Sequence, residues 1–159
     1  MKATEQDKEF MREAIRLANE SVKQGGGPFG AVIVKDGEII AKSSNSVTID
    51  QDPTAHAEVN TIRMACRKLG THDLSGCVIY TSCEPCPMCL GAIYWSHLSK
   101  VFYGNNRNDA SAIDFDDDFI YKEIDKPISD RSIPFIPVLK REAKQSFKLW
   151  KEKEDKSVY

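Results

Sequence analysis

The sequence predicts an α/β protein, a three-layer α/β/α sandwich with a mixed sheet of about five strands, and three observations lead to this fold class. An Asp-Gly pair joins two apolar runs at residues 31–41, which is a strong signal for a β-hairpin. Beyond this pair, short apolar runs alternate with segments in which apolar residues recur at helical spacing. The length of 159 residues suits one domain over residues 1–159. Strands that alternate with helices after an opening hairpin are typical of a mixed sheet covered by helices.

The N-terminal half is expected to hold a helix, the hairpin and a second helix. Thr4 begins a capping pattern, and apolar residues then recur at helical spacing until the Gly-rich segment 25–28. The runs 31–34 and 39–41 are the hairpin strands. Asp52-Pro53 resembles an N-cap followed by proline at the first helical position, so a helix is expected from there to Gly70.

The C-terminal half is expected to add further strands and helices in a weaker pattern. Residues 77–80 and 101–103 are short apolar strands, and Pro87 can open a helix between them. Helical turns are expected over residues 109–112 and 119–124. We then expect an edge strand over residues 135–139, interrupted by Pro137, and a charged helix or tail over residues 140–159.

Composition and charge narrow the class of protein. Lys plus Arg is 22 and Asp plus Glu is 24, so the formal net charge is −2. This balance lacks the positive surplus of proteins that wrap nucleic acid or lie on anionic lipid. No apolar run reaches the length of a membrane span, and the N-terminus lacks a signal sequence. We therefore expect a cytoplasmic protein without nucleic-acid or membrane partners, in which disulfides are rare.

Two short motifs carry the chemistry. The first is His56-Ala57-Glu58, and the second, Pro85 to Cys89, contains Cys86 and Cys89. One imidazole and two thiolates are ligands that Zn²⁺ prefers, and three protein ligands leave a position for a water molecule. Glu58 cannot share a helix face with His56 at a spacing of two, so the two side chains can converge only around a helix end. We predict that Glu58 lies beside the metal-bound water without binding the metal.

Other interpretations of these cysteines compete with the catalytic one. A closed structural zinc site would add Cys83 to the three ligands, but it would leave Glu58 unexplained. An iron–sulfur cluster would need a further cysteine at position 93, where isoleucine stands. The segment 25–30 formally matches a nucleotide-binding loop, but the predicted helix precedes it and the strand follows, which is the reverse order. We interpret it as a tight turn that leaves Phe29 available to stack on a planar ligand.

With these residues in view, the chain resembles the cytidine-deaminase-like superfamily of zinc hydrolases, whose signature is H-x-E together with P-C-x-x-C. Within it, the chain is most similar to the bacterial guanine deaminase family, over residues 26–37, 52–59, 80–95 and 115–127. The zinc motifs specify only the superfamily. Trp95 and the Phe115-Asp116-Asp117 segment point to the guanine branch, because tRNA adenosine deaminases typically have His at the position of Trp95.

The resemblance implies hydrolytic deamination of guanine to xanthine and ammonia. It implies one Zn²⁺ per subunit with a bound water, held by His56, Cys86 and Cys89. Glu58 would be the proton shuttle, and Asp117 would contact the purine edge or assist proton transfer. A carboxylate suits this edge because guanine offers its N1–H and exocyclic amine as adjacent donors.

The resemblance also implies substrate contacts and a partner. Asn45 would hydrogen-bond the base, Phe29 and Trp95 would flank its plane, and Tyr159 would close the pocket. In this family the C-terminal segment, here from about residue 105, crosses to a second subunit in a domain-swapped homodimer. By implication Asp117 and Tyr159 could serve a neighbour's site.

Three alternative functions stay open at this point. A deaminase of another purine or nucleoside, guanosine especially, would share every zinc motif, and only the shape of the pocket would distinguish it. A tRNA adenosine deaminase is less favoured, given the acidic balance and Trp95. A zinc-stabilised binding module without turnover is the alternative outside enzymes.

Overall fold

The computed structural model describes residues 2–159, which divide into a first compact unit that ends at Asp118 and a second, Phe119–Tyr159. The first unit holds the sheet, with strand order β2-β1-β3-β4. Strand β1 (Gly30–Lys35) pairs antiparallel with β2 (Glu38–Ser44) and with β3 (Val78–Cys83). Strand β3 pairs parallel with β4 (Lys100–Asn105).

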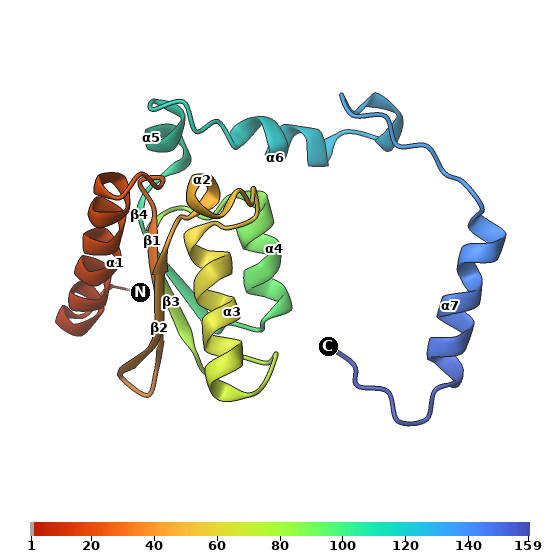
Figure 1. Ribbon diagram of the computed structural model, residues 1–159, viewed down its shortest axis with the longest axis horizontal. Coiled ribbons are helices and arrows are strands. Elements are labelled where there is room, and N and C mark those ends of the chain that lie inside the picture. Colours follow the sequence, from red (N-terminus) through yellow and green to blue (C-terminus); the bar gives the residue numbers. More distant parts are fainter. Residues whose placement is uncertain (1) are drawn as a thin grey trace. The chain divides into compact units, whose positions relative to one another are not determined.

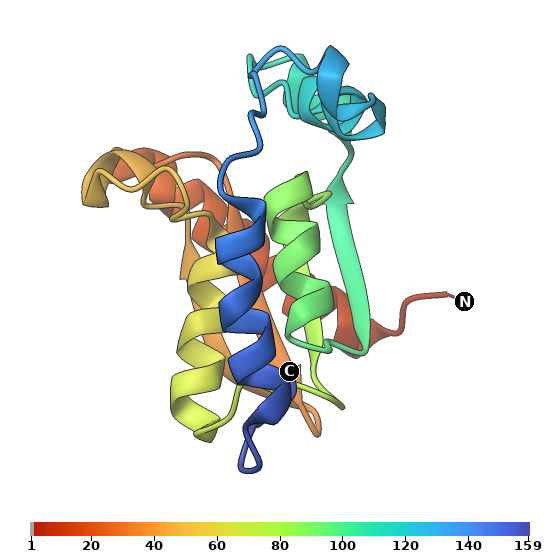
Figure 2. The ribbon, with the colours of Figure 1, turned by 90° about the vertical axis from the view of Figure 1, so that its right-hand side faces the viewer.

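Helices cover both faces of this sheet. Helix α1 (Glu5–Lys23) lies on one face, and α3 (Ala57–Leu69) and α4 (Pro87–Trp95) lie on the other, as Figures 1 and 2 show. Two short helices, α2 (Val47–Asp50) and α5 (Arg107–Ser111), sit in the connections after β2 and β4. The predicted α/β/α sandwich with a mixed sheet is confirmed, with four strands where about five were expected.

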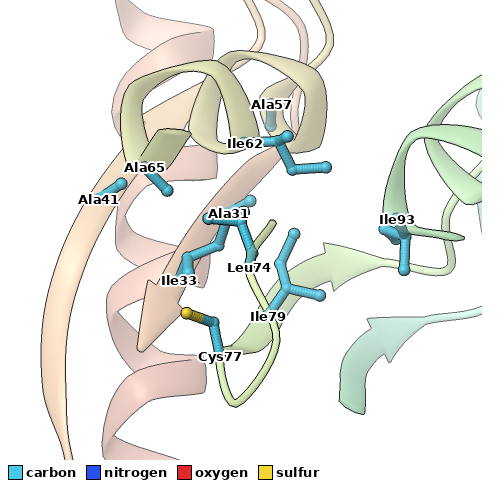
Figure 3. Close-up of a cluster of buried hydrophobic side chains, with 10 residues drawn as sticks. All are labelled: Ala31, Ile33, Ala41, Ala57, Ile62, Ala65, Leu74, Cys77, Ile79 and Ile93. Atoms are coloured by element: carbon cyan, nitrogen blue, oxygen red, sulfur yellow. The ribbon is translucent and has the colours of Figure 1, made fainter. Parts of the chain in front are cut away.

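The core forms on both sides of β1, which explains its continuous apolar sequence. Ala31 and Ile33 face α3 and α4, where they pack with Ile62, Ile79 and Ile93 (Figure 3). The alternate residues Val32 and Val34 pack on the other side with α1 and with Tyr80 of β3. Successive side chains of a strand point to opposite faces, so a central strand between two helical layers has to be apolar throughout.

Helix α1 is fixed to the sheet at its start and near its middle. Thr4 and Asp7 form a capping box, and Asp7 also accepts a 2.5 Å hydrogen bond from the Tyr80 hydroxyl. A side chain at Gly30 would place its Cβ 2.3 Å from the carbonyl oxygen of Ala14. Glycine at this position therefore lets the helix pack closely against β1.

The predicted start of one helix and one predicted strand are wrong. Asp52 does not cap a helix: its carboxylate accepts hydrogen bonds from the backbone and hydroxyl of Thr54 in a local turn, and α3 begins at Ala57 with His56 as its N-cap. Residues 135–139 form no strand. Pro134 and Pro137 remove two backbone donors there, which disfavours a ladder of hydrogen bonds.

The second unit contains little that is buried. It holds most of α6 (Asp118–Asp125), which begins at the last residue of the first unit, then the 3₁₀ turn η1 (Ile128–Asp130) and α7 (Lys140–Glu152). Its internal contacts include the backbone and hydroxyl of Ser132 donating to Glu123, and Arg131 over the ring of Phe135. None of the residues 119–159 is buried. No helix within residues 2–159 is both long and apolar enough to cross a lipid bilayer.

Candidate active site

Two helix N-termini bring the predicted metal ligands together. His56 is the N-cap of α3, and Cys86 is the N-cap of α4, both with extended backbone angles. Pro87 occupies the first turn of α4, where its missing N–H costs no helical hydrogen bond. Cys89 lies within the same first turn and is buried. The chain thus places one imidazole and two sulfurs where orphan backbone N–H groups and the positive helix ends favour anionic ligands.

The three ligand atoms lie close enough to hold one metal ion. The Nδ1 atom of His56 lies 3.5 Å from each of the Cys86 and Cys89 sulfur atoms, and all three ligand atoms lie within 4.8 Å of one another. Among residues 2–159, no other group of three such side chains meets this condition. One nitrogen and two sulfurs match the donor preference of Zn²⁺. Cys83 is outside the group, and its thiol faces the carbonyl oxygen of Asn106 at 3.9 Å.

The electrostatics of this group favour a thiolate. Hydrogen bonds from Cys89 and His56 lower the pKa of the Cys86 thiol to about 4. The pKa of Cys89 is raised, because its thiol donates a hydrogen bond to Cys86 and is buried. The hydrogen bond to Cys86 raises the pKa of His56. An anionic sulfur at a helix N-terminus is the form in which cysteine binds metal.

Glu58 lies beside this group, in the first turn of α3, where the motif was predicted to sit. Its carboxylate is buried, and this burial raises its pKa. One oxygen, Oε1, accepts a 3.0 Å hydrogen bond from the hydroxyl of Thr81, while Oε2 lies 3.4 Å from the Cys89 sulfur. A carboxylate whose pKa is raised by burial suits a group that both accepts and donates protons near neutral pH.

The turn after α1 fixes the orientation of Asn45. This buried side chain uses Oδ1 to accept hydrogen bonds from the backbone N–H groups of Gly27 at 3.3 Å and Val47 at 3.2 Å. A Cβ atom at Gly27 would lie 3.0 Å from the Asn45 side chain, tighter than most such contacts. The arrangement leaves the amide NH₂ of Asn45 as the group that can donate to a ligand.

Phe115 contacts Phe29 and lies two residues before Asp117. The Phe29 ring packs edge-on against Phe115, with ring centroids 4.9 Å apart and planes at 90°. Asp117 follows two residues later, and its Oδ1 atom is buried with no hydrogen-bond partner among the described residues. Burial raises the pKa of Asp117, and the nearby Cys86 raises it further. A buried carboxylate oxygen without a partner is a place where a ligand donor would fit.

Two further substrate contacts were predicted, Trp95 and Tyr159. Helix α4 continues from Cys89 to Trp95, about 9 Å along its axis, and the indole of Trp95 is 64% exposed. Tyr159, the last residue of the second unit, is 68% exposed. Their predicted roles stay predictions.

Two contacts at the site were not predicted from the sequence. Thr81 reaches Glu58 across a separation of 23 residues. Glu84 accepts a 3.1 Å hydrogen bond from the Arg107 backbone and forms a 3.2 Å ion pair with its guanidinium, which ties the loop before α4 to α5. No local pattern signals either contact, because both depend on how β3 and its neighbours pair.

Comparisons with known proteins point to one family. Residues 4–105 match the family described as the cytidine and deoxycytidylate deaminase zinc-binding region. The chain is 56% identical to guanine deaminase of Bacillus subtilis over 151 residues, which is 94% of this chain and 97% of that protein. The X-ray structure of that enzyme superposes with a TM-score of 0.93 at 55% identity and covers 96% of this chain and 98% of that one.

More distant relatives fall in two groups. The structure of guanine deaminase from Nitrosomonas europaea has a TM-score of 0.67 at 33% identity, with 74% of this chain and 67% of that chain covered. The tRNA-specific adenosine deaminase of Aquifex aeolicus is 48% identical over 94 residues, only 59% of this chain and 62% of that protein.

Proposed function

Because the chain belongs to the cytidine and deoxycytidylate deaminase zinc-binding family, we propose that it is a guanine deaminase, which hydrolyses guanine to xanthine and ammonia. The observation that carries the choice of guanine is the similarity to the Bacillus subtilis enzyme over 94% of the chain. That similarity extends beyond residue 105, where the family match ends. The similarity to a tRNA adenosine deaminase covers 59% of the chain, which leaves tRNA as the weaker alternative.

Zinc is the metal of this proposal, with one ion per subunit held by His56, Cys86 and Cys89. The nitrogen and two sulfurs within 4.8 Å support this assignment, because they leave a coordination position for solvent. When bound in such a site, zinc acts as a Lewis acid that lowers the pKa of a water molecule toward about 7.

Glu58 moves the protons in this scheme. Its carboxylate takes one proton from the water that attacks C2 of the purine and delivers it to a ring nitrogen. It then takes the second proton from the hydroxyl group now on C2 and delivers it to the departing amine. Water supplies the oxygen of the new carbonyl group, and ammonia leaves with the nitrogen. The burial of Glu58 beside Cys89 supports this role, since the carboxylate is near the ligand group but outside it.

Four side chains would bind the base. Asp117 accepts hydrogen bonds from the purine edge, which its unpartnered buried oxygen supports. The NH₂ group of Asn45 donates to an acceptor of the base, since its Oδ1 atom already accepts two backbone hydrogen bonds. Guanine presents O6 and N7 as adjacent acceptors, where adenine presents an amine and N7. Phe29 stacks on one face of the ring, and Trp95 is the proposed second aromatic partner.

We further propose a homodimer in which the C-terminal segment crosses to a second copy. The second unit has no buried residue, yet many of its large apolar side chains are exposed, among them Phe119, Ile124, Phe135, Ile136, Phe147 and Trp150. Exposed apolar surface of this extent is typical of an interaction site. Tyr159 would then close the partner's pocket, whereas Asp117 interacts electrostatically with His56 and Cys86 of its own chain.

The five cysteines are free, which fits a reducing compartment such as the cytoplasm.

A substrate panel tests the proposal. The purified protein is incubated with guanine, guanosine, adenine, adenosine, cytosine and cytidine, and ammonia release is measured together with zinc content and solution mass. We expect ammonia and xanthine from guanine, one zinc per chain and the mass of a dimer. A folded, zinc-loaded protein that releases no ammonia from guanine would contradict the proposed activity. A monomer with full activity would contradict the proposed exchange.

A further inference from the structure

Thr81 occupies a position in β3 that packing alone would give to an apolar residue. Its side chain is fully buried, and on its strand it shares a face with Ile79, which belongs to the core against α3. On the sheet, Thr81 pairs with Ala31 of β1 and Tyr103 of β4, so strands flank it on both sides. Valine has nearly the same shape and carries no polar atom. A buried hydroxyl group at this position therefore needs a hydrogen-bond partner.

That partner is the carboxylate of Glu58. The Thr81 hydroxyl donates to Oε1 at 3.0 Å, and the other oxygen, Oε2, is the one near the Cys89 sulfur at 3.4 Å. The two oxygens of Glu58 thus have different neighbours. A β-branched residue has few rotamers, and a strand hydrogen-bonded on both edges is rigid, so the donor is held in a fixed place.

We propose that Thr81 is a positioning residue for the deamination: its hydroxyl holds Oε1 of Glu58 so that Oε2 faces the ligand group and carries the proton transfers. This inference rests on the proposed function and adds to it a residue outside the metal and substrate contacts. Thr81 acts through Glu58 and lies outside the group formed by His56, Cys86 and Cys89. Loss of the hydroxyl would remove the side-chain hydrogen bond to Oε1 and would let the carboxylate turn.

Thr61 offers a matched control. It is also fully buried, one turn after Ala57 in α3, and its hydroxyl donates only to the backbone carbonyl oxygens of Ala57 at 2.7 Å and Ala31 at 3.3 Å. Thr61→Val removes a buried hydroxyl of the same kind without removing a contact to Glu58. The comparison separates the loss of a buried hydrogen bond from the loss of the orientation of Glu58.

The kinetic test compares Thr81→Val, Thr81→Ser and Thr61→Val as zinc-loaded proteins with guanine. General acid–base catalysis contributes roughly 100- to 10,000-fold, so a misoriented carboxylate should lower kcat by about 10- to 100-fold in Thr81→Val. We expect KM and zinc content to stay near the wild-type values. Thr81→Ser, which keeps the hydroxyl, should recover most of kcat, and Thr61→Val should keep it. Wild-type kcat in Thr81→Val, loss of its zinc, or an equal loss in Thr61→Val would overturn the inference.

A second measurement does not depend on the substrate. Thr81→Val, Glu58→Ala and the double variant are unfolded in urea, with Thr81→Ala as a second substitution in case valine packs poorly. The quantity compared is the urea concentration at which half of the protein is unfolded. If the two side chains are coupled, substitution of Thr81 should shift this midpoint by clearly different amounts in the wild-type protein and in Glu58→Ala. Equal shifts in both backgrounds would overturn the inference. A wild-type protein without activity on guanine would instead refute the proposed function, and the coupling could still be measured.

Discussion

The Oε2 atom of Glu58 lies 3.4 Å from the sulfur of Cys89, so a buried carboxylate borders the metal-ligand group without belonging to it. Substitution of Glu58 should have different effects depending on whether this residue is a metal ligand or a proton shuttle. Loss of a ligand weakens zinc binding, whereas loss of a shuttle leaves zinc in place and stops proton transfer.

Glu58→Gln should retain zinc and lose ammonia release by at least about 100-fold, because the amide keeps the shape of the side chain but cannot accept a proton. Metal analysis and a guanine assay on the same preparation test this. Cys86→Ser is the matched control, and it should lose zinc. If Glu58→Gln loses zinc along with activity, Glu58 is a ligand; if it keeps full activity, Glu58 is not the shuttle.

The sequence was sufficient for the part of the site that local structure determines. His56, Glu58, Cys86 and Cys89 all lie at or just after a helix N-terminus, and the spacing of residues within a first turn can be reasoned out from helix geometry. The same local reasoning misplaced the start of α3, because Asp52 forms a turn with Thr54 in preference to a helix cap.

The rest depends on contacts between distant segments. Thr81 is an ordinary strand residue in the sequence, and its hydroxyl gains a role only because α3 crosses β3 at Glu58. Residues 135–139 have strand-forming side chains, but Pro137 and the preceding Pro134 cannot donate to a neighbour, and that backbone effect outweighs the propensity.

Cys83→Ser should leave the zinc content unchanged. Burial raises the pKa of the Cys83 thiol to about 11, and its sulfur lies outside the group of ligand atoms formed by His56, Cys86 and Cys89. Its sulfur faces the carbonyl oxygen of Asn106, which a serine hydroxyl could also approach. Zinc loss from a folded Cys83→Ser protein, judged by circular dichroism, would favour a closed four-ligand structural site.

Asp117→Asn should lower kcat/KM for guanine by about 10-fold or more, because it replaces one acceptor oxygen with a donor at the purine edge. The substitution should not destabilise the protein. Burial raises the pKa of Asp117 above its unfolded value, so the ionised carboxylate opposes folding at pH 7, and the neutral amide removes that cost. Guanine kinetics and urea unfolding at pH 7 test both statements. An unchanged kcat/KM for guanine would show that Asp117 does not contact the substrate.

Charge pairs join α1 to the hairpin through Glu13. Glu13 accepts hydrogen bonds from Arg16 at 2.7 Å and from Lys42 of β2 at 2.8 Å, and its side chain is 21% exposed. These partners lower the pKa of Glu13 to about 2 from an ordinary value of 4.5. A depressed pKa stabilises the folded state fully above the unfolded value and loses that contribution as the pH falls toward the folded value.

Glu13→Gln should therefore lower the free energy of unfolding by about 1 kcal/mol at pH 7, since solvent screens pairs whose cations are half exposed. The difference in the free energy of unfolding between Glu13→Gln and the wild type should become smaller as the pH is lowered from 4.5 toward 2. Urea unfolding at pH 7, 4 and 3 tests this. Glu9→Gln is the control, because Glu9 pairs with Arg12 on the exposed surface of the same helix and should change stability by less than about 0.5 kcal/mol. A Glu13→Gln difference that is absent at pH 7, or constant with pH, would show that these pairs do not anchor α1.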